Sequence, residues 1–472
     1  MNMQIVILGQ GLWLQVAAAL VASQLRPWGV RCTAVEVPGE PEPGSVASGP
    51  ELHGLCRLLG QSWQELLLKA RGSFNLGTDY RDALTHQAAG AAGPARWFVP
   101  FGHLGLKSEA AEFAQGLFSY LAGQAEQGPE PYCLAALAAW QGKFAVPPAN
   151  RTDLRDMLDF GLHLDRQGLC AWLRRFSERQ GVRFVAADAL FSAQTAQGPI
   201  ASVQLAGGES LPVDFCLDCR PRTGVKSGAV MLQLFAGDPQ QGPGKPCTSA
   251  ERVPWGWLVR HPLANGCVWQ TEFDPQVQKR DQVQAWLDGN LGALDWQLRS
   301  RQTSSPDEVW TGNCLQLGPV VETLDSPLLG AMGPLQALLV SWLDMLPNQA
   351  SCPATARLFN GYWQQYREEL NTYLTLHETP LETHTGRLFA RLGRVPTAET
   401  DAVRPVQLMT MLYGLGLRPE LPSRLLLDNE PAQVGAALAQ IRRRLDTLVT
   451  NMPSHAQTLA RCLDGRPAHP SY

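Results

Sequence analysis

Residues near the amino terminus have the types and spacing that could hold a nucleotide. Gly9 and Gly11 follow a short apolar run rich in β-branched residues, and a helix-like stretch over 12–25 comes after them. A second strand-like run over 32–37 contains Glu36, about 25 residues beyond the glycines. Glycines let the backbone approach a pyrophosphate, a helix N-terminus favours its charge, and an acid at this spacing can bind a ribose hydroxyl. The pattern is typical of the opening βαβ unit of a dinucleotide-binding domain.

The glycine pattern is incomplete at its helical end. Leu14 stands where a third glycine would let the helix pack closely on the strand, and Trp13 is bulky for a tight phosphate turn. A βαβ unit that packs normally and holds no nucleotide therefore fits these residues equally well.

The composition describes a chain long enough for two or three domains. It has 472 residues, 45% of them hydrophobic and 17% charged, with a formal net charge of -4. No basic run or basic–aromatic patch stands out, so we expect no nucleic-acid partner. Residues 5–22 carry no charge, but the glycine turn interrupts them, so a buried strand–turn–helix explains them better than a membrane segment. We therefore expect a soluble, cytoplasmic protein.

The cysteines indicate a reducing compartment. There are 11 of them, an odd number scattered along the chain, which argues against a disulfide framework. Cys216 and Cys219 form a CxxC pair on a strand-like stretch, but no second pair follows at the spacing of a zinc site. We interpret them as buried strand cysteines and expect no metal.

Hydrophobic periodicity and turn residues predict alternating strands and helices. The clearest later unit is a strand over 160–165 that leads into a helix over 166–180, which Asp165 caps and Gly181 ends. The other expected helices cover 51–59, 63–69, 109–126, 132–140, 281–292, 330–346, 357–376 and 430–452. The other expected strands cover 72–80, 182–185, 190–194, 201–205, 215–219, several within 227–275, and 313–319. A surface loop is expected over 84–96 and an apolar turn over 98–102.

Several stretches together resemble one family. They are the glycine box at 9–13, a strand at 74–82, the segment starting at 163–166, the strand at 215–219, the W-x-W stretch at 255–259, the strand at 312–318, and the helical segments at 366–377 and 452–455. Over essentially its whole length, the chain resembles the flavin-dependent tryptophan halogenases, a branch of the FAD monooxygenase class.

The resemblance implies an α/β fold. It implies an FAD/NAD(P)-binding Rossmann-like three-layer domain with an inserted substrate-side β-sheet over 1–330, and a mainly helical C-terminal region over 331–472. It also implies that FAD is held by Gly9, Gly11, Leu12, Trp13, Glu36 and Gly318. Trp255 and Trp257 would lie on the substrate side. They alternate on an expected strand, so both side chains should point to one face, where two core tryptophans are an equally good interpretation.

The chemistry of the family is implied in the same way. Reduced FAD reacts with oxygen and then with chloride or bromide to give hypohalous acid, which travels through a tunnel to a lysine beside the indole. A nearby glutamate assists. A cation is needed to present the electrophilic halogen, and a carboxylate stabilises the positive charge that develops on the ring.

This sequence departs from the family at the positions that carry the chemistry. Asn75 replaces the lysine, and Leu328 replaces the assisting glutamate. Leu329 and Gly330 replace a Ser-Thr pair associated with halide binding. Further departures fall at 45–48, at Arg220 and Pro221, and at Arg260. The segments that match core elements survive while those that match chemistry have changed, which favours a retained fold with a lost or altered reaction.

Three hypotheses follow. The first is a divergent, non-halogenating flavoprotein-like homologue, a pseudoenzyme that could act with a flavin reductase or with an active halogenase relative. The second is an active FAD-dependent monooxygenase that hydroxylates an aromatic small molecule directly. The third is a halogenase that uses a displaced cation, for which Lys69 and Lys107 are the nearest candidates by sequence, although Lys69 is expected on a solvated helix face.

Overall fold

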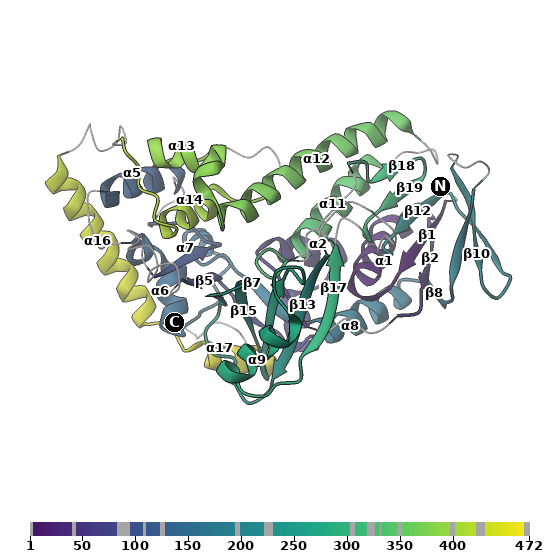
Figure 1. The fold of residues 1–472 in the computed structure, drawn as a ribbon, viewed down its shortest axis with the longest axis horizontal. Coiled ribbons are helices and arrows are strands. Elements are labelled where there is room, and N and C mark those ends of the chain that lie inside the picture. The colour runs from purple at the N-terminus through teal and green to yellow at the C-terminus, as the bar shows by residue number, and fades with distance from the viewer. Residues whose placement is uncertain are drawn as a thin grey trace. The chain divides into compact units, whose positions relative to one another are not determined.

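Two units make up the structure, and each is built from three separate stretches of chain (Figure 1). The first unit contains 1–72, 164–236 and 272–365, and the second contains 73–163, 237–271 and 366–472. In this computed structural model the described residues are 3–39, 44–82, 95–106, 110–122, 128–193, 199–220, 230–302, 307–318, 326–330, 332–346, 352–396, 402–421 and 430–466. The expected loop over 84–96 and Lys107 fall largely or wholly outside these ranges.

A six-stranded sheet forms the centre of the first unit. Its order is β18-β19-β12-β1-β2-β8, and every neighbouring pair is parallel except the edge pair of β18 and β19. The strands are β1 (Gln4–Gly9), β2 (Arg31–Glu36), β8 (Arg183–Ala186), β12 (Phe215–Asp218), β18 (Trp310–Thr311) and β19 (Cys314–Gln316). Each parallel strand ends at the same edge, where ligands bind in open α/β sheets.

The parallel sheet is the middle of three layers. Side chains alternate along β1, so Val6 and Leu8 point to one face while Ile5 and Ile7 point to the other, and all four are fully buried. On one face lies a three-stranded antiparallel meander formed by β9 (Ala189–Ala193), β10 (Ile200–Leu205) and β11 (Ser210–Pro212). On the other face α1 (Gly11–Leu25) contacts β1 and β2 and packs on α8 (Arg166–Arg179).

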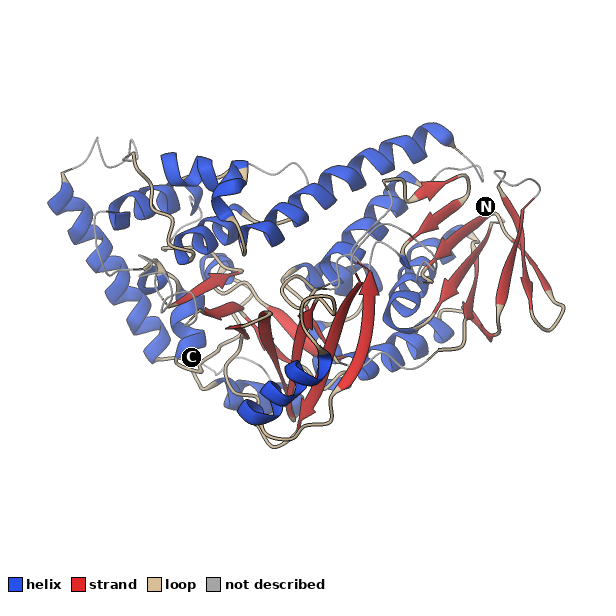
Figure 2. Cartoon of the chain, viewed as in Figure 1, coloured by secondary structure: helices blue, strands red, loops and turns tan. Residues whose placement is uncertain are grey.

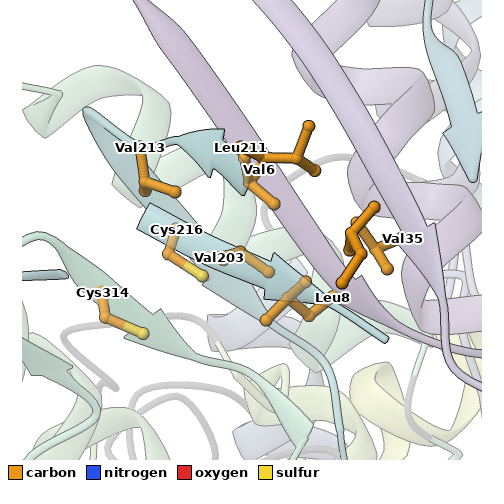
Figure 3. Packing of buried hydrophobic residues seen from close by; sticks show 9 residues of the cluster. Val6, Leu8, Val35, Val203, Leu211, Val213, Cys216 and Cys314 are labelled. Carbon is orange, nitrogen blue, oxygen red and sulfur yellow. The ribbon is translucent and has the colours of Figure 1, made fainter. Parts of the chain in front are cut away.

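The core between the sheet and the meander is apolar (Figure 3). The parallel sheet contributes Val6, Leu8, Val35, Cys216 and Cys314, and the meander with its closing residue contributes Val203, Leu205, Leu211 and Val213. Burying each of the valines and leucines among them is worth roughly 1.5–3 kcal/mol relative to leaving it in water. The core therefore fixes the ends of β1, β2, β12 and β19 relative to one another.

The second unit contains a mainly antiparallel sheet with one parallel pair. Its strands run in the order β6-β5-β14-β15-β16, and only β5 and β14 are parallel. They are β5 (Gly77–Arg81), β6 (Arg96–Pro100), β14 (Thr248–Val253), β15 (Gly256–Leu263) and β16 (Gly266–Phe273). Beside it, β4 (Ser73–Asn75) pairs antiparallel with β7 (Gly161–Asp165).

The described chain has three further strands, which are β3 (Ser45–Ala47), β13 (Val230–Asp238) and β17 (Gln297–Gln302). Helices supply the other regular structure (Figure 2), and after residue 331 the regular elements of the described chain are all helices. Besides α1 and α8, the α-helices of the described chain are α2 (Glu51–Leu59), α3 (Trp63–Lys69), α5 (Ala110–Ala122), α6 (Leu134–Trp140), α7 (Thr152–Met157), α9 (Arg280–Leu291), α11 (Met332–Met345), α12 (Pro353–Leu376), α13 (His384–Leu392), α14 (Pro405–Gly414), α16 (Pro431–Thr450) and α17 (His455–Leu463). Within the described ranges, no helix is both long and apolar enough to cross a membrane. The mixed α/β architecture with a Rossmann-like domain confirms the expected fold class.

Two sequence predictions about strands are wrong. The strand expected over 72–80 is divided at Leu76, because the Leu76 N–H donates to the Pro246 carbonyl at 2.8 Å and its own carbonyl accepts from the Phe101 N–H. Leu76 therefore belongs to neither of the two short strands on its two sides. The apolar turn expected over 98–102 is largely strand β6, which pairs along the whole of β5.

Candidate functional site

The glycines singled out in the sequence meet at the carboxyl edge of the parallel sheet. Gly9 has φ +144° and Gly11 has φ +62°, conformations that favour glycine. A Cβ atom on Gly9 would lie 2.8 Å from the Cβ of Cys219, and one on Gly318 would lie 1.9 Å from the Arg220 carbonyl oxygen. The close approach of the chain to itself therefore requires Gly9 and Gly318, whether or not a nucleotide binds.

The N-terminus of α1 has no side-chain cap, so its first backbone N–H groups have no side-chain acceptor from the N-cap residue. The N-cap residue Gln10 makes no side-chain cap hydrogen bond, and the first turn holds no acidic residue. Leu12 and Leu14 are fully buried and Trp13 is 4% exposed, so these large side chains pack in the protein interior. The residues that break the glycine pattern therefore belong to the core of the first unit.

Glu36 ends β2 as expected, but both of its carboxylate oxygens already have partners. Oε1 accepts from Nε2 of Gln15 on α1 at 3.1 Å, and Oε2 accepts from Arg174 on α8. The Arg174 guanidinium also lies 4.4 Å from the ring centre of Phe184 and pairs with Glu178 at 2.9 Å. A ribose hydroxyl at this carboxylate would have to share it with a fixed arginine.

Asn75 lies at the end of β4 and is 2% exposed. Its Oδ1 accepts from the backbone N–H of Gly77 at 3.3 Å and of Thr248 at 3.4 Å. The side-chain amide thus holds the corner between β4 and β5 against the start of β14. This role needs an acceptor, which a lysine ammonium does not offer.

The neighbouring histidine is also part of the interior. His163, on β7, is fully buried, and its Nε2 is 2.8 Å from Oγ1 of Thr248. Its ring stacks on His261 with the centres 5.2 Å apart. Burial, reinforced by that second histidine, lowers the pKa of His163 well below its ordinary value, so the ring carries no charge at neutral pH. Asp165 caps α8 as expected, because its Oδ2 accepts from the Gly168 N–H at 2.7 Å.

Leu328 lies in a short turn of the first unit. Oγ of Ser326 accepts from the Leu328 N–H at 3.4 Å, and the Ser326 carbonyl accepts from Leu329 and Gly330 at 3.1 and 2.9 Å. Leu328 is half-buried and offers no group that could hold a proton or stabilise a cation. Asn75 belongs to the other unit.

The two tryptophans do not share a strand, which corrects the expectation that they do. Trp255 lies in the turn before β15, is half-buried, and donates from Nε1 to Oγ1 of Thr271 at 2.9 Å. Trp257 lies within β15, is 5% exposed, and packs edge-on against Tyr80. The turn places the two side chains in different surroundings, because Pro254 and Trp255 reverse the chain between β14 and β15.

The remaining predicted residues are the cysteines and the candidate lysines. All 11 cysteines are free, with Cys216 and Cys219 buried. In the part of the chain that the structure describes, no group of three or more His, Cys, Asp or Glu side chains could hold a metal ion. Lys69 is exposed on α3, as expected for a solvated lysine. Sequence reasoning missed the buried ring cluster around Tyr80, whose members come from distant stretches.

Comparison with known proteins places the chain in a family. A family model described as tryptophan halogenase matches residues 4–385. The chain belongs to the tryptophan halogenase family. This membership confirms the resemblance stated from the sequence.

Solved structures share the halogenase fold along nearly the full chain. BrvH, a flavin-dependent halogenase from Brevundimonas sp. BAL3, matches with a TM-score of 0.84 and 20% identity, covering 97% of this chain and 99% of that one. Xcc4156, a flavin-dependent halogenase from Xanthomonas campestris, matches with a TM-score of 0.82 and 22% identity, covering 99% of each chain. A tryptophan halogenase from Shewanella frigidimarina NCIMB 400 has a TM-score of 0.82 at 15% identity and 99% coverage of each chain. At these identities the similarity describes the fold.

Proposed function

We propose that this chain is a non-halogenating member of the tryptophan halogenase family that retains an FAD site at the carboxyl edge of its parallel sheet. FAD, when bound and reduced, supplies electrons to oxygen. A flavin reductase is the expected partner for that reduction, and an aromatic small molecule is the expected substrate class if any substrate chemistry remains.

Asn75 carries the proposal. The family reaction needs a cation at this position to present an electrophilic halogen, and the amide here is neutral, buried, and engaged with two backbone N–H groups. Leu328 adds to it, because an aliphatic side chain cannot stabilise charge on an aromatic ring. Each unit therefore lacks one of the two groups that the halogenation step requires.

Residues of the first unit fit FAD. The positive φ angles of Gly9 and Gly11 and the uncapped N-terminus of α1 suit a pyrophosphate. Oε1 of Gln15 is buried without a hydrogen-bond partner, beside the Glu36 carboxylate that its own Nε2 contacts. A ribose hydroxyl could donate to either group. The competing Arg174 predicts that the nucleotide binds less tightly than it would to a free carboxylate.

The test begins with binding. Oxidised and reduced FAD are titrated into the purified full chain while flavin fluorescence and the visible spectrum are recorded. A matched pair of variants reports on the ribose end: Glu36→Gln should weaken binding, whereas Arg174→Gln should strengthen it. Absence of binding at roughly 100 µM, which corresponds to less than about 5–6 kcal/mol, would remove FAD from the proposal.

The second stage asks whether the chain halogenates. The protein is incubated with FAD, a flavin reductase, NADH, oxygen, bromide or chloride, and a panel of indoles, in parallel with an active halogenase as a positive control. We expect hydrogen peroxide and no halogenated product by mass spectrometry. Halogenated indole above the level of a protein-free reaction would refute the loss of halogenation. A hydroxylated indole would identify the chain as a monooxygenase instead.

A further inference from the structure

A buried cluster of rings in the second unit surrounds a tyrosine–histidine hydrogen bond. Tyr80 comes from β5, Trp97 from β6, Trp257 from β15 and Tyr373 from α12, and His377 follows α12 directly. Their exposed fractions are 0, 2, 5, 6 and 5%, respectively. Nothing in the proposed function uses these side chains.

The hydrogen bonds fix which histidine nitrogen carries the proton. Nδ1 of His377 is 2.9 Å from the backbone carbonyl of Tyr373, which can only accept, so Nδ1 carries the hydrogen. Burial lowers the pKa of His377 to about 4, so the ring is neutral at physiological pH and Nε2 has a free lone pair. The Tyr80 hydroxyl, 3.0 Å from Nε2, therefore donates its proton toward a base.

The ring contacts provide a route for an electron. The Tyr80 ring is stacked on Trp97, with the centres 5.2 Å apart and the planes 5° from parallel. Trp257 meets Tyr80 edge-on at 5.3 Å and Trp97 edge-on at 6.3 Å. Indole and phenol rings are the side chains most readily oxidised by one electron without metal chemistry. Tyr80 thus touches two electron-transfer partners and one proton acceptor.

We propose that Tyr80 is a redox-active tyrosine, which loses an electron through Trp97 or Trp257 and its phenolic proton to His377. The oxidant is an oxidised transition-metal complex that takes one electron at the protein surface, the class that photogenerated tris(bipyridine)ruthenium(III) represents in the experiment below. Net oxidation converts the Tyr80 phenol and neutral His377 into the neutral Tyr80 phenoxyl radical and the His377 imidazolium, while the acceptor gains one electron. A thiol or ascorbate can return an electron to the radical as the proton moves back from Nε2. The site does not depend on FAD binding.

A neighbouring carboxylate offsets part of the burial that disfavours a proton on His377. The adjacent Glu378 carboxylate raises the pKa of His377 and so stabilises the imidazolium, although Arg252, paired with Glu378 at 2.8 Å through two hydrogen bonds, opposes this effect. The hydroxyl of Tyr373 lies 3.5 Å from that of Tyr80, a long contact that the proton transfer to His377 does not use. Because Tyr80 is fully buried, a thiol or ascorbate cannot touch the phenoxyl oxygen and can reduce it only through the ring contacts, so the radical should outlive one on an exposed tyrosine.

The experiment generates the oxidant by light. The full chain is mixed with tris(bipyridine)ruthenium(II) and persulfate, illuminated, frozen at increasing delays, and examined by electron paramagnetic resonance. Wild-type protein should give a persistent tyrosyl signal. Tyr80→Phe should lose the persistent signal while keeping the ring stack. His377→Gln can still accept the hydrogen bond but cannot take the proton, so its persistent signal should also be lost.

Two further measurements make the outcome unambiguous. Tyr373→Phe is the matched control, since it removes the neighbouring hydroxyl and should leave a persistent signal. Near-ultraviolet circular dichroism of each variant reports whether the aromatic packing is retained. A persistent signal that survives in Tyr80→Phe, or one that His377→Gln leaves unchanged, would overturn the proposal. So would the absence of any persistent tyrosyl signal in the wild-type protein.

Discussion

Restoring the family lysine at Asn75 should destabilise the protein without restoring halogenation. Asn75→Lys removes the acceptor for the N–H groups of Gly77 and Thr248, whose bonds of 3.3 and 3.4 Å are long. Leaving them unsatisfied costs about 1 kcal/mol each at these lengths. An ammonium at a site that is 2% exposed adds a desolvation penalty. Together we expect roughly 3–5 kcal/mol, a large part of the stability of an ordinary domain.

A matched variant separates the two contributions. Asn75→Met has an unbranched side chain of similar length and no charge, so it should lose only the roughly 2 kcal/mol of the two amides. The penalty specific to lysine should fade as pH rises toward about 10.4, because the buried amine prefers its neutral form and deprotonation in the unfolded chain then costs less. Urea unfolding of wild type and both variants, followed by tryptophan fluorescence and near-ultraviolet circular dichroism, measures these differences. The halogenation assay is run on the same samples.

Two results would refute this reasoning. If Asn75→Lys unfolds at the same urea concentration as the wild type, the Asn75 amide does not hold β4, β5 and β14 together. If it halogenates an indole, then Leu328 and the altered turn after it are not obstacles to the reaction, and the loss proposed here rests on one side chain.

Other perturbations have equally definite outcomes. Burial holds the pKa of His377 at about 4, against 6.5 for an ordinary histidine, so the neutral ring's contribution to stability is complete above about pH 6.5 and is lost as pH falls through 4. The urea concentration at half-unfolding should therefore fall over that pH range, and it should fall less steeply in His377→Gln. Gly318→Ala places a Cβ 1.9 Å from a carbonyl oxygen, so it should lower the free energy of unfolding in urea by at least about 2 kcal/mol. Gly289→Ala, inside α9 with nothing within 4 Å of the new Cβ, should instead raise it by about 0.5–1 kcal/mol. Arg301→Met breaks a bidentate pair with Glu272 (2.5 and 2.6 Å) and should cost about 3–5 kcal/mol by the same measurement; an unchanged midpoint would mean that this carboxylate is solvated.

The sequence predicts the parts of this fold that depend on local patterns. Helices α2 and α3 begin and end where expected, because turn residues bound short amphipathic runs. β1, α1 and β2 follow from an apolar strand, a glycine turn and a helical run. The shorter helices α7, α13, α14 and α17 were not predicted, since their patterns are brief and their burial comes from tertiary packing.

The candidate site is less predictable, because its contacts span long stretches of chain. The position of Glu36 follows from spacing, but its pairing with Arg174 joins residues 138 apart in sequence. The bond between Tyr80 and His377 joins residues 297 apart. Likewise, the sequence shows that Asn75 is not lysine but gives no indication of the backbone groups it holds. Motifs predict which residues could form a site, whereas the three-dimensional structure shows which of those residues already have hydrogen-bond partners within the protein.

The free cysteines can be used to measure how often each unit of the protein opens. Nine cysteines are buried, while Cys170 and Cys352 are partly exposed. The first unit contains Cys32, Cys56, Cys170, Cys216, Cys219, Cys314 and Cys352, and the second contains Cys133, Cys247, Cys267 and Cys462. A buried thiol can react with an alkylating reagent only when its surroundings separate. Timed alkylation followed by peptide mass spectrometry would therefore give a separate opening rate for each unit of the unmodified protein.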